Sequence, residues 1–114
     1  ILDYQYTLYN AYSDSLLLDL RKIALAILSV HPHNVDQLNL MALSYSEMKD
    51  YNQAYKWIRK AIEVAPTEVE VQQNFKNILL KTFKVKDAKK EIRRLLLQAS
   101  EPLCGFLTVL YTSI

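Results

Sequence analysis

Few residues of this chain have the type and spacing that catalysis or metal binding requires. His31 and His33 form a His-x-His pair, but two histidines do not supply the three or four ligands of a zinc site. Cys104 is the only cysteine, and no histidine lies near it in the sequence to activate its thiol. The single glycine, Gly105, excludes the glycine-rich loops that bind phosphate groups. The sequence therefore predicts that the protein is not an enzyme and binds neither a cofactor nor a metal ion.

A run of cations between residues 81 and 94 is the strongest charge feature. Residues 1–70 contain six Lys or Arg and nine Asp or Glu (net −3), whereas residues 71–114 contain eight and three (net +5). The run consists of Lys81, Lys84, Lys86, Lys89, Lys90, Arg93 and Arg94. Such a run is most often a solvated helix face, and the alternative is a binding site for an acidic partner. Nucleic acid is the weaker alternative because no aromatic residue interleaves the cations from Lys84 to Arg94.

The composition indicates a single helical domain. A chain of 114 residues has the length of one domain, and a hydrophobic fraction of 51% is enough to form a core. One glycine and three prolines leave little room for the turns of an all-β domain. No apolar run approaches the roughly 18 residues of a membrane-spanning helix. A single cysteine cannot form an internal disulfide, and we expect a cytoplasmic protein.

The spacing of apolar residues predicts a series of helices joined by short turns. The expected helices cover about 2–13, 16–30, 35–48, the stretch from the turn at 49–52 to about 64, then 68–83, 87–99 and a last helix from 101. His31-Pro32 ends the second helix, because the residue before a proline avoids the α region. The expected N-terminal caps are Asn34, Thr67 in a capping box with Glu70, Asp87 and Ser100.

Pro32 and Pro66 each close a stretch that has the pattern of two amphipathic helices. The interval between them is about 34 residues, which is typical of stacked helix–turn–helix repeats. The middle stretch carries a further set of residues at defined spacing: Leu38, Met41, Ala42, Tyr45, Ala54, Ile58, Ala61 and Pro66. This set resembles the consensus of the tetratricopeptide repeat (TPR) family. The neighbouring stretches match less well, because Leu8 and Lys76 occupy the position of a small residue.

The resemblance implies an all-α fold, a right-handed α-solenoid of antiparallel helix pairs with an extra C-terminal helix. It divides the chain into a degenerate TPR-like repeat at 1–34, a TPR repeat at 35–68, a degenerate repeat at 69–100 and a capping or docking helix at 101–114. In such a fold, the small residues Ala42, Ala54 and Ala61 would let neighbouring helices approach closely.

In the TPR architecture the first helix of each pair lines a concave groove that binds a partner. Carried onto this chain, the resemblance implies the groove residues Tyr6, Tyr9, Tyr12, Asn39, Leu40, Leu43, Asn74 and Asn77. This set contains no cation, so the groove is poorly suited to the terminal carboxylate of an acidic tail. Tyrosine, leucine and amide side chains suit an apolar or amphipathic protein segment instead. The alternative is that the tyrosines only fill the core of the first repeat.

The segment from Leu103 to Ile114 contains no charged residue. Its apolar stripe consists of Leu103, Phe106, Leu107, Leu110 and Tyr111. Soluble monomers rarely expose a stripe of this size, so we expect it to pack on the last repeat near Phe75 and Ile92. The apolar surface that remains predicts self-association or a second interface with another subunit.

Taken together, these patterns favour a protein–protein interaction module, namely a TPR adaptor or chaperone. A small secretion-system chaperone is the more specific form of this hypothesis. The alternative is a non-catalytic docking or regulatory segment of a larger enzyme, which the apolar ends of the chain would fit. The resemblance is informative about fold, and the partner has to be argued from the site.

Overall fold

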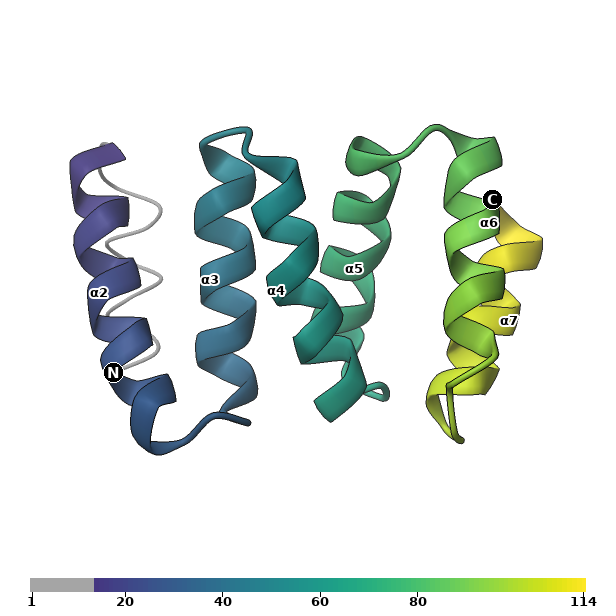
Figure 1. The fold of residues 1–114 in the computed structure, drawn as a ribbon, viewed down its shortest axis with the longest axis horizontal. Helices are drawn as coiled ribbons and strands as arrows, with labels where there is room; N and C mark the ends of the chain where they lie inside the picture. Colours follow the sequence, from purple (N-terminus) through teal and green to yellow (C-terminus); the bar gives the residue numbers. More distant parts are fainter. Residues whose placement is uncertain (1–13) are drawn as a thin grey trace.

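The computed structural model describes residues 14–114, and within this range the protein is all-helical, without a strand (Figure 1). The helices are α2 (Asp14–Val30), α3 (Val35–Glu47), α4 (Tyr51–Val64), α5 (Val69–Thr82), α6 (Val85–Leu96) and α7 (Leu103–Ser113). The all-α fold class and the order of these helices are as predicted from the sequence. The helix expected at 2–13, which carries Tyr6, Tyr9 and Tyr12, lies outside the described residues.

Successive helices run in opposite directions, and each packs against the next one in the chain (Figure 1). The connections between them contain only two to six residues. Because these connections are so short, each helix must run back alongside the helix before it. Contact between α3 and α5 adds one pairing that skips a helix. As a result, α5 lies against both helices of the preceding pair.

The first residues of the helices recur at a fixed interval. α3, α5 and α7 begin at Val35, Val69 and Leu103, which are equally spaced along the chain. The same interval separates the start of α4 at Tyr51 from the start of α6 at Val85. Buried positions recur at the same interval. Ala54 corresponds to Ala88 and Ile58 corresponds to Ile92, and all four side chains are fully buried. The interval between the two prolines is therefore also the interval of the helices.

Two helix starts are fixed by side chains of the kind that the sequence predicts. The Asn34 carboxamide oxygen accepts a hydrogen bond from the Gln37 N–H at 3.2 Å, which confirms Asn34 as the cap of α3. Asp50 caps α4 in the same way, through the Gln53 N–H at 3.3 Å. Between these helices Lys49 adopts a left-handed conformation with φ of 62°. The Asp50 N–H then donates to the Tyr45 carbonyl at 2.9 Å, which ends α3 in a Schellman-type turn.

Three other predicted caps are wrong. α5 begins after Glu68 and has no side-chain cap, so Thr67 and Glu70 do not form a capping box. The Gln72 amide instead donates to the Pro66 carbonyl at 2.6 Å and holds this turn. α6 begins two residues before Asp87, which lies in the first turn. α7 begins after Pro102, and the Ser100 side chain does not cap it.

The hydrophobic core extends from α2 to α7, with aromatic rings at its C-terminal half. Phe75 of α5 is fully buried, and its ring centroid lies 6.0 Å from that of Tyr55 in α4 and 6.1 Å from that of Phe106 in α7. Leu107 and Leu110 of α7 are also buried against this core. The expectation that the uncharged C-terminal helix packs on the helices before it is confirmed.

Candidate functional site

The predicted groove residues from α3 and α5 meet through hydrogen bonds between their polar side chains. Asn74 of α5 donates an amide hydrogen to the Asn39 carboxamide oxygen of α3 at 2.9 Å. Asn39 in turn donates to the Glu70 carboxylate of α5 at 3.4 Å. Asn39 is only 3% exposed, so its burial is compensated by partners on the neighbouring helix. These three side chains join α3 to α5 and orient the polar groups between the two helices.

The other predicted residues of this face extend it along both helices. Leu43 lies one turn beyond Asn39 on α3 and is half-buried. Asn77 lies one turn beyond Asn74 on α5 and is exposed, as is Glu70. We define the α3–α5 face as Asn39, Leu43, Glu70, Asn74 and Asn77. It combines one apolar side chain with several amide and carboxylate groups. Tyr6, Tyr9 and Tyr12 lie outside the described residues.

Leu40 does not line this face, which corrects the expectation from the sequence. All residues from Gln37 to Ala42 are buried, and Leu40 is fully so. The reason is that α3 packs against α2, α4 and α5, which enclose most of its circumference. Leu40 therefore belongs to the core.

The C-terminal stripe is likewise only partly available as an interface. Leu107 is fully buried and Leu110 is 3% exposed, so neither can contact a second protein. Leu103, Phe106 and Tyr111 are half-buried and pack on the core with one side. The stripe is thus largely buried on α5 and α6. Less of its apolar surface remains for a second interface than the sequence predicts.

A polar network between α4 and α6 was not predicted. The Tyr55 hydroxyl donates to the Glu91 carboxylate, which also accepts two bonds from the Arg94 guanidinium at 2.8 and 2.7 Å. Burial, and then the bond to Glu91, raises the pKa of the Tyr55 phenol well above its usual range. Burial opposes ionisation of Glu91, but the bonds from Arg94 and Tyr55 outweigh it and hold the carboxyl pKa below its usual value. Of these contacts, only the Arg94–Glu91 pair could have been predicted from the sequence, because the two residues are three positions apart on one helix.

Replacing Glu91 with glutamine should reduce the stability of the protein at neutral pH, and it should also make that stability less dependent on pH in the acid range. At pH 7 we expect a loss of about 1.5–3 kcal/mol in the free energy of unfolding, the range for hydrogen bonds to a charged group. Because the folded state lowers the pKa of Glu91, its contribution is present above the unfolded value of about 4.3 and disappears as the pH falls through the lower folded value. Urea denaturation between pH 7 and pH 3 measures this, and the two stability curves should converge at low pH.

Glu63→Gln is the matched control for this prediction. Glu63 forms an ion pair with Arg59 at 3.5 Å, and its side chain is 53% exposed, against 10% for Glu91. An exposed pair of this kind contributes at most about 1 kcal/mol. Curves for Glu91→Gln and wild type that stay parallel over the whole pH range would contradict the role given to Glu91.

A cavity of about 300 Å³ lies between α4, α6 and α7. Its apolar lining includes Ile62, Leu95, Leu103 and Leu107, and the Arg59–Glu63 ion pair lies among its lining residues. The two charges satisfy each other, so the cavity presents no unpaired charged group of this pair to a ligand. It contains no residue of the α3–α5 face.

The remaining candidates for chemistry give no site within residues 14–114. His31 and His33 are both exposed, and the described residues contain no cluster of metal-ligating side chains. Cys104 is a free, half-buried thiol. None of the helices in the described range combines the length and hydrophobicity needed to cross a membrane.

No family model, no curated protein and no solved structure matches this chain. Any assignment of function therefore depends on the residues and the geometry described above.

Proposed function

We propose that this chain is a TPR-like right-handed α-solenoid that binds an apolar or amphipathic segment of a partner protein on its α3–α5 face. The observation that carries the proposal is the constant interval between the starts of α3, α5 and α7, which also separates the starts of α4 and α6. Helix pairs that recur at about 34 residues are the defining feature of TPR arrays, and this chain has that interval. Such arrays present an extended concave surface to their partners.

Burial at the positions of the TPR consensus supports the same interpretation. Ala42, Ala54 and Ala61 are fully buried, as expected where two helices approach closely. Ile58, at a position for a large apolar residue, is fully buried as well. Lys76, which departs from the consensus, is exposed. The departure therefore does not place a charge in the core.

The chemistry of the α3–α5 face indicates the kind of segment that it would bind. Asn74 and Asn77 carry amide groups that can donate to and accept from the backbone or polar side chains of a bound segment. Leu43 offers the apolar contact beside them. Glu70 is an exposed carboxylate on the same face, which disfavours a strongly acidic segment. The tyrosines of the preceding predicted helix, Tyr6, Tyr9 and Tyr12, would continue this surface.

Two narrower roles use the same surface. The chain could act as a small secretion-system chaperone, or as a non-catalytic docking segment of a larger enzyme. The sequence that surrounds these residues in the full-length protein separates the two. A start codon a few residues upstream supports the chaperone, and a catalytic domain in the same chain supports the docking segment.

Leu43→Asp should abolish partner binding without loss of helical content. A carboxylate on a surface that contacts apolar groups must lose its hydration without gaining a partner, and we expect at least about a hundredfold weaker binding. The partner is first identified by affinity capture with the wild-type chain and mass spectrometry, then purified and titrated. Leu97→Asp is the control, because Leu97 is 87% exposed and lies outside this face. Equal affinities of wild type and Leu43→Asp would place the binding site elsewhere.

A further inference from the structure

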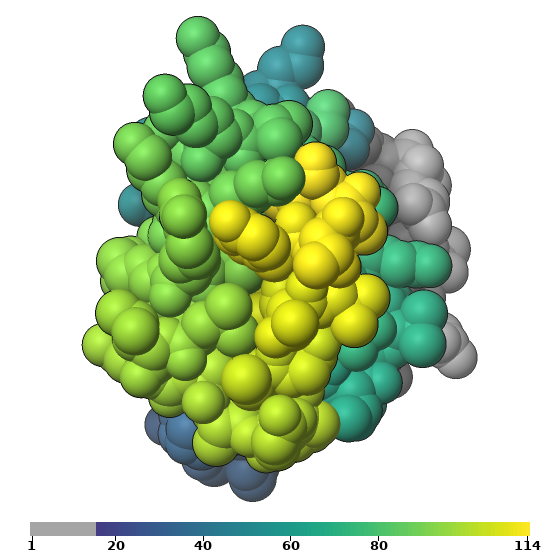
Figure 2. Space-filling view, turned by 90° about the vertical axis from the view of Figure 1, so that its right-hand side faces the viewer, coloured from purple at the N-terminus to yellow at the C-terminus, as the bar shows by residue number. Residues whose placement is uncertain are grey.

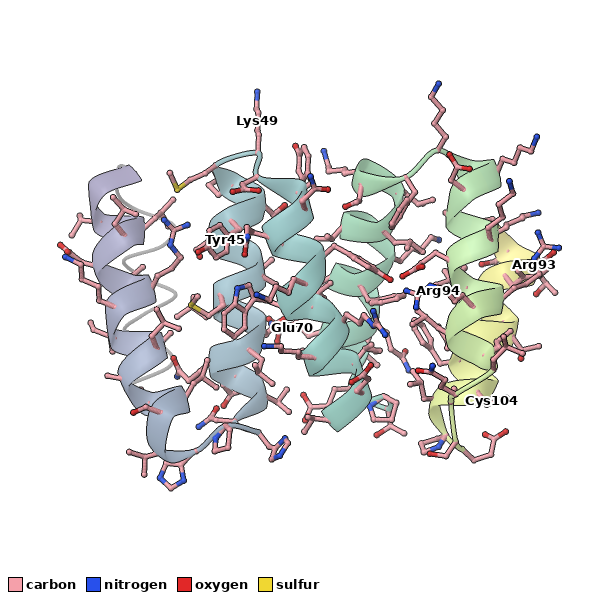
Figure 3. All side chains as sticks on the ribbon, viewed as in Figure 1. Tyr45, Lys49, Glu70, Arg93, Arg94 and Cys104 are labelled. Atoms are coloured by element: carbon pink, nitrogen blue, oxygen red, sulfur yellow. The ribbon has the colours of Figure 1, made fainter. Side chains whose placement is uncertain are left out.

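α6 presents three chemically different sides to its surroundings. Ala88, Ile92 and Leu95 are buried in the core. Glu91 and Arg94 lie on a second side, where Glu91 bonds to Tyr55 of α4. The third side carries Lys86, Lys89, Lys90 and Arg93, which follow the helical spacing i, i+3, i+4 and i+7. Figure 3 shows the division directly: Arg94 extends toward α4 and α5, whereas Arg93 lies on the outer side near α7.

Two of the cations on this third side lie next to an aromatic ring of α7. The Lys89 ammonium lies 5.4 Å from the centroid of the Tyr111 ring, and the Arg93 guanidinium lies 5.8 Å from it. Within the described residues the ion pairs are Lys22–Asp19, Arg59–Glu63 and Arg94–Glu91, and none involves these four cations. Two of the four positive charges thus form cation–π contacts with Tyr111, and none of the four belongs to one of these ion pairs.

α7 adds an uncharged surface directly beside these cations. Figure 2 shows α7 next to α6 on this end of the molecule, with the side chains of both helices forming one continuous face. Thr108, Val109 and Thr112 of α7 are exposed, Val109 by 67%. We define the α6–α7 face as the four cations with Thr108, Val109, Tyr111 and Thr112. Along it, a positive row borders a neutral, partly apolar strip.

We propose that the α6–α7 face binds an acidic amphipathic helix of a partner protein. Carboxylates on one side of such a helix would lie against Lys86, Lys90 and Arg93, and its apolar side chains would cover Val109. Charge complementarity of this kind accelerates association and selects the partner. The surface is separate from the α3–α5 face, where the exposed Glu70 disfavours an acidic segment.

The same features argue against two other occupants. In a symmetric dimer through this face, the positive row of one copy would lie against that of the other and repel it. Nucleic acid would need an open aromatic ring for base stacking, but Tyr111 is half-buried and lies beside Lys89 and Arg93. The neutral strip of α7 would also give a phosphate backbone no cation to contact.

The test uses a fluorescein-labelled designed peptide of about 16 residues, ~24 Å long as a helix, with leucines on one side and glutamates on the other. A second peptide has lysine in place of every glutamate. Fluorescence anisotropy with the purified chain should show at least about tenfold tighter binding of the glutamate peptide. Its affinity should fall as the ionic strength rises from about 0.05 to 0.2 M.

Charge reversal then locates the site. Lys86→Glu with Lys90→Glu should weaken binding of the glutamate peptide at least about tenfold, and Val109→Asp should weaken it as well. Lys22→Glu with Lys49→Glu makes the same change in net charge on other elements and should change the affinity by less than about twofold. All of these positions are exposed, so circular dichroism should show an unchanged fold. Leu43→Asp should leave peptide binding intact, which separates this site from the α3–α5 face.

Three results would overturn the proposal. If both double variants lost the same affinity for the glutamate peptide, the loss would come from the change in net charge and not from the α6–α7 face. Tighter binding to a single-stranded oligonucleotide or to phosphatidylserine vesicles than to the glutamate peptide would assign the face to nucleic acid or membrane. A dimer in sedimentation velocity that Lys86→Glu with Lys90→Glu dissociates would assign the face to a second copy of the chain.

Discussion

Replacing Phe75 with alanine should lower the free energy of unfolding by about 3–5 kcal/mol, the range for deleting a buried aromatic side chain. Phe75 is fully buried on α5, between Tyr55 of α4 and Phe106 of α7. The substitution removes both ring contacts and leaves a cavity where three helices meet. Because domains of this size have a total stability of about 5–15 kcal/mol, the variant should unfold at a far lower urea concentration. Urea denaturation followed by circular dichroism measures the change.

Phe83→Ala provides a control with the same chemical change. The Phe83 ring contacts Tyr55 edge-on at 5.3 Å between centroids, but its side chain is only half-buried. The cavity left behind would open partly to water, and we expect a cost of about 1–2 kcal/mol. If both variants lose the same stability, Phe75 does not have the central position in the core that we assign to it.

Removing residues 103–114 should destabilise the helices that remain, although none of them is shortened. Leu107 and Leu110 are 0% and 3% exposed, and burying a leucine contributes about 1.5–3 kcal/mol. Together the two leucines account for about 3–6 kcal/mol, and Phe75 would in addition lose its contact with Phe106. We expect the truncated chain to melt at a much lower temperature or to aggregate through the uncovered core. Thermal denaturation and sedimentation of the truncated chain test this.

A point variant keeps this prediction testable if the truncated chain does not fold. Leu107→Ala should cost about 2–5 kcal/mol, as buried leucines do. Val109→Ala, on the same helix but 67% exposed, should change stability by no more than about 0.5 kcal/mol. A truncated chain as stable as the full one would mean that α7 is not part of the core.

Features that depend on neighbours in the sequence could be predicted from it. Apolar spacing and His31-Pro32 placed α2 and the start of α3 to within two residues, because helix formation is decided over a few turns. Asn34 could be recognised as a cap for the same reason. The predicted Thr67 capping box does not form, because the turn before α5 is held instead by a hydrogen bond from the Gln72 amide to the Pro66 carbonyl. Local rules thus predicted the helices, but they did not always predict how the first turn of a helix is capped.

The residues of the α3–α5 face were predicted less well than the helices. Asn39 and Asn74 lie 35 residues apart, and the resemblance to TPR repeats placed both on one surface, where they do bond to each other. Leu40 was assigned to the same surface, although α2, α4 and α5 enclose it. A repeat pattern predicts which helices face each other. How far each side chain is covered depends on how closely the helices approach.

The sequence by itself determined that this protein is helical, where its helices lie and that they recur with a fixed period, since these properties follow from short-range spacing. Only the tertiary structure decided which charges and rings meet. It brought Tyr55 to Glu91 across 36 residues, and it placed Tyr111 beside Lys89 and Arg93, although the stretch from Lys84 to Arg94 contains no aromatic residue of its own. Contacts of this kind form because packing the apolar faces of α4, α6 and α7 fixes the remaining faces relative to one another, and no local rule encodes that arrangement.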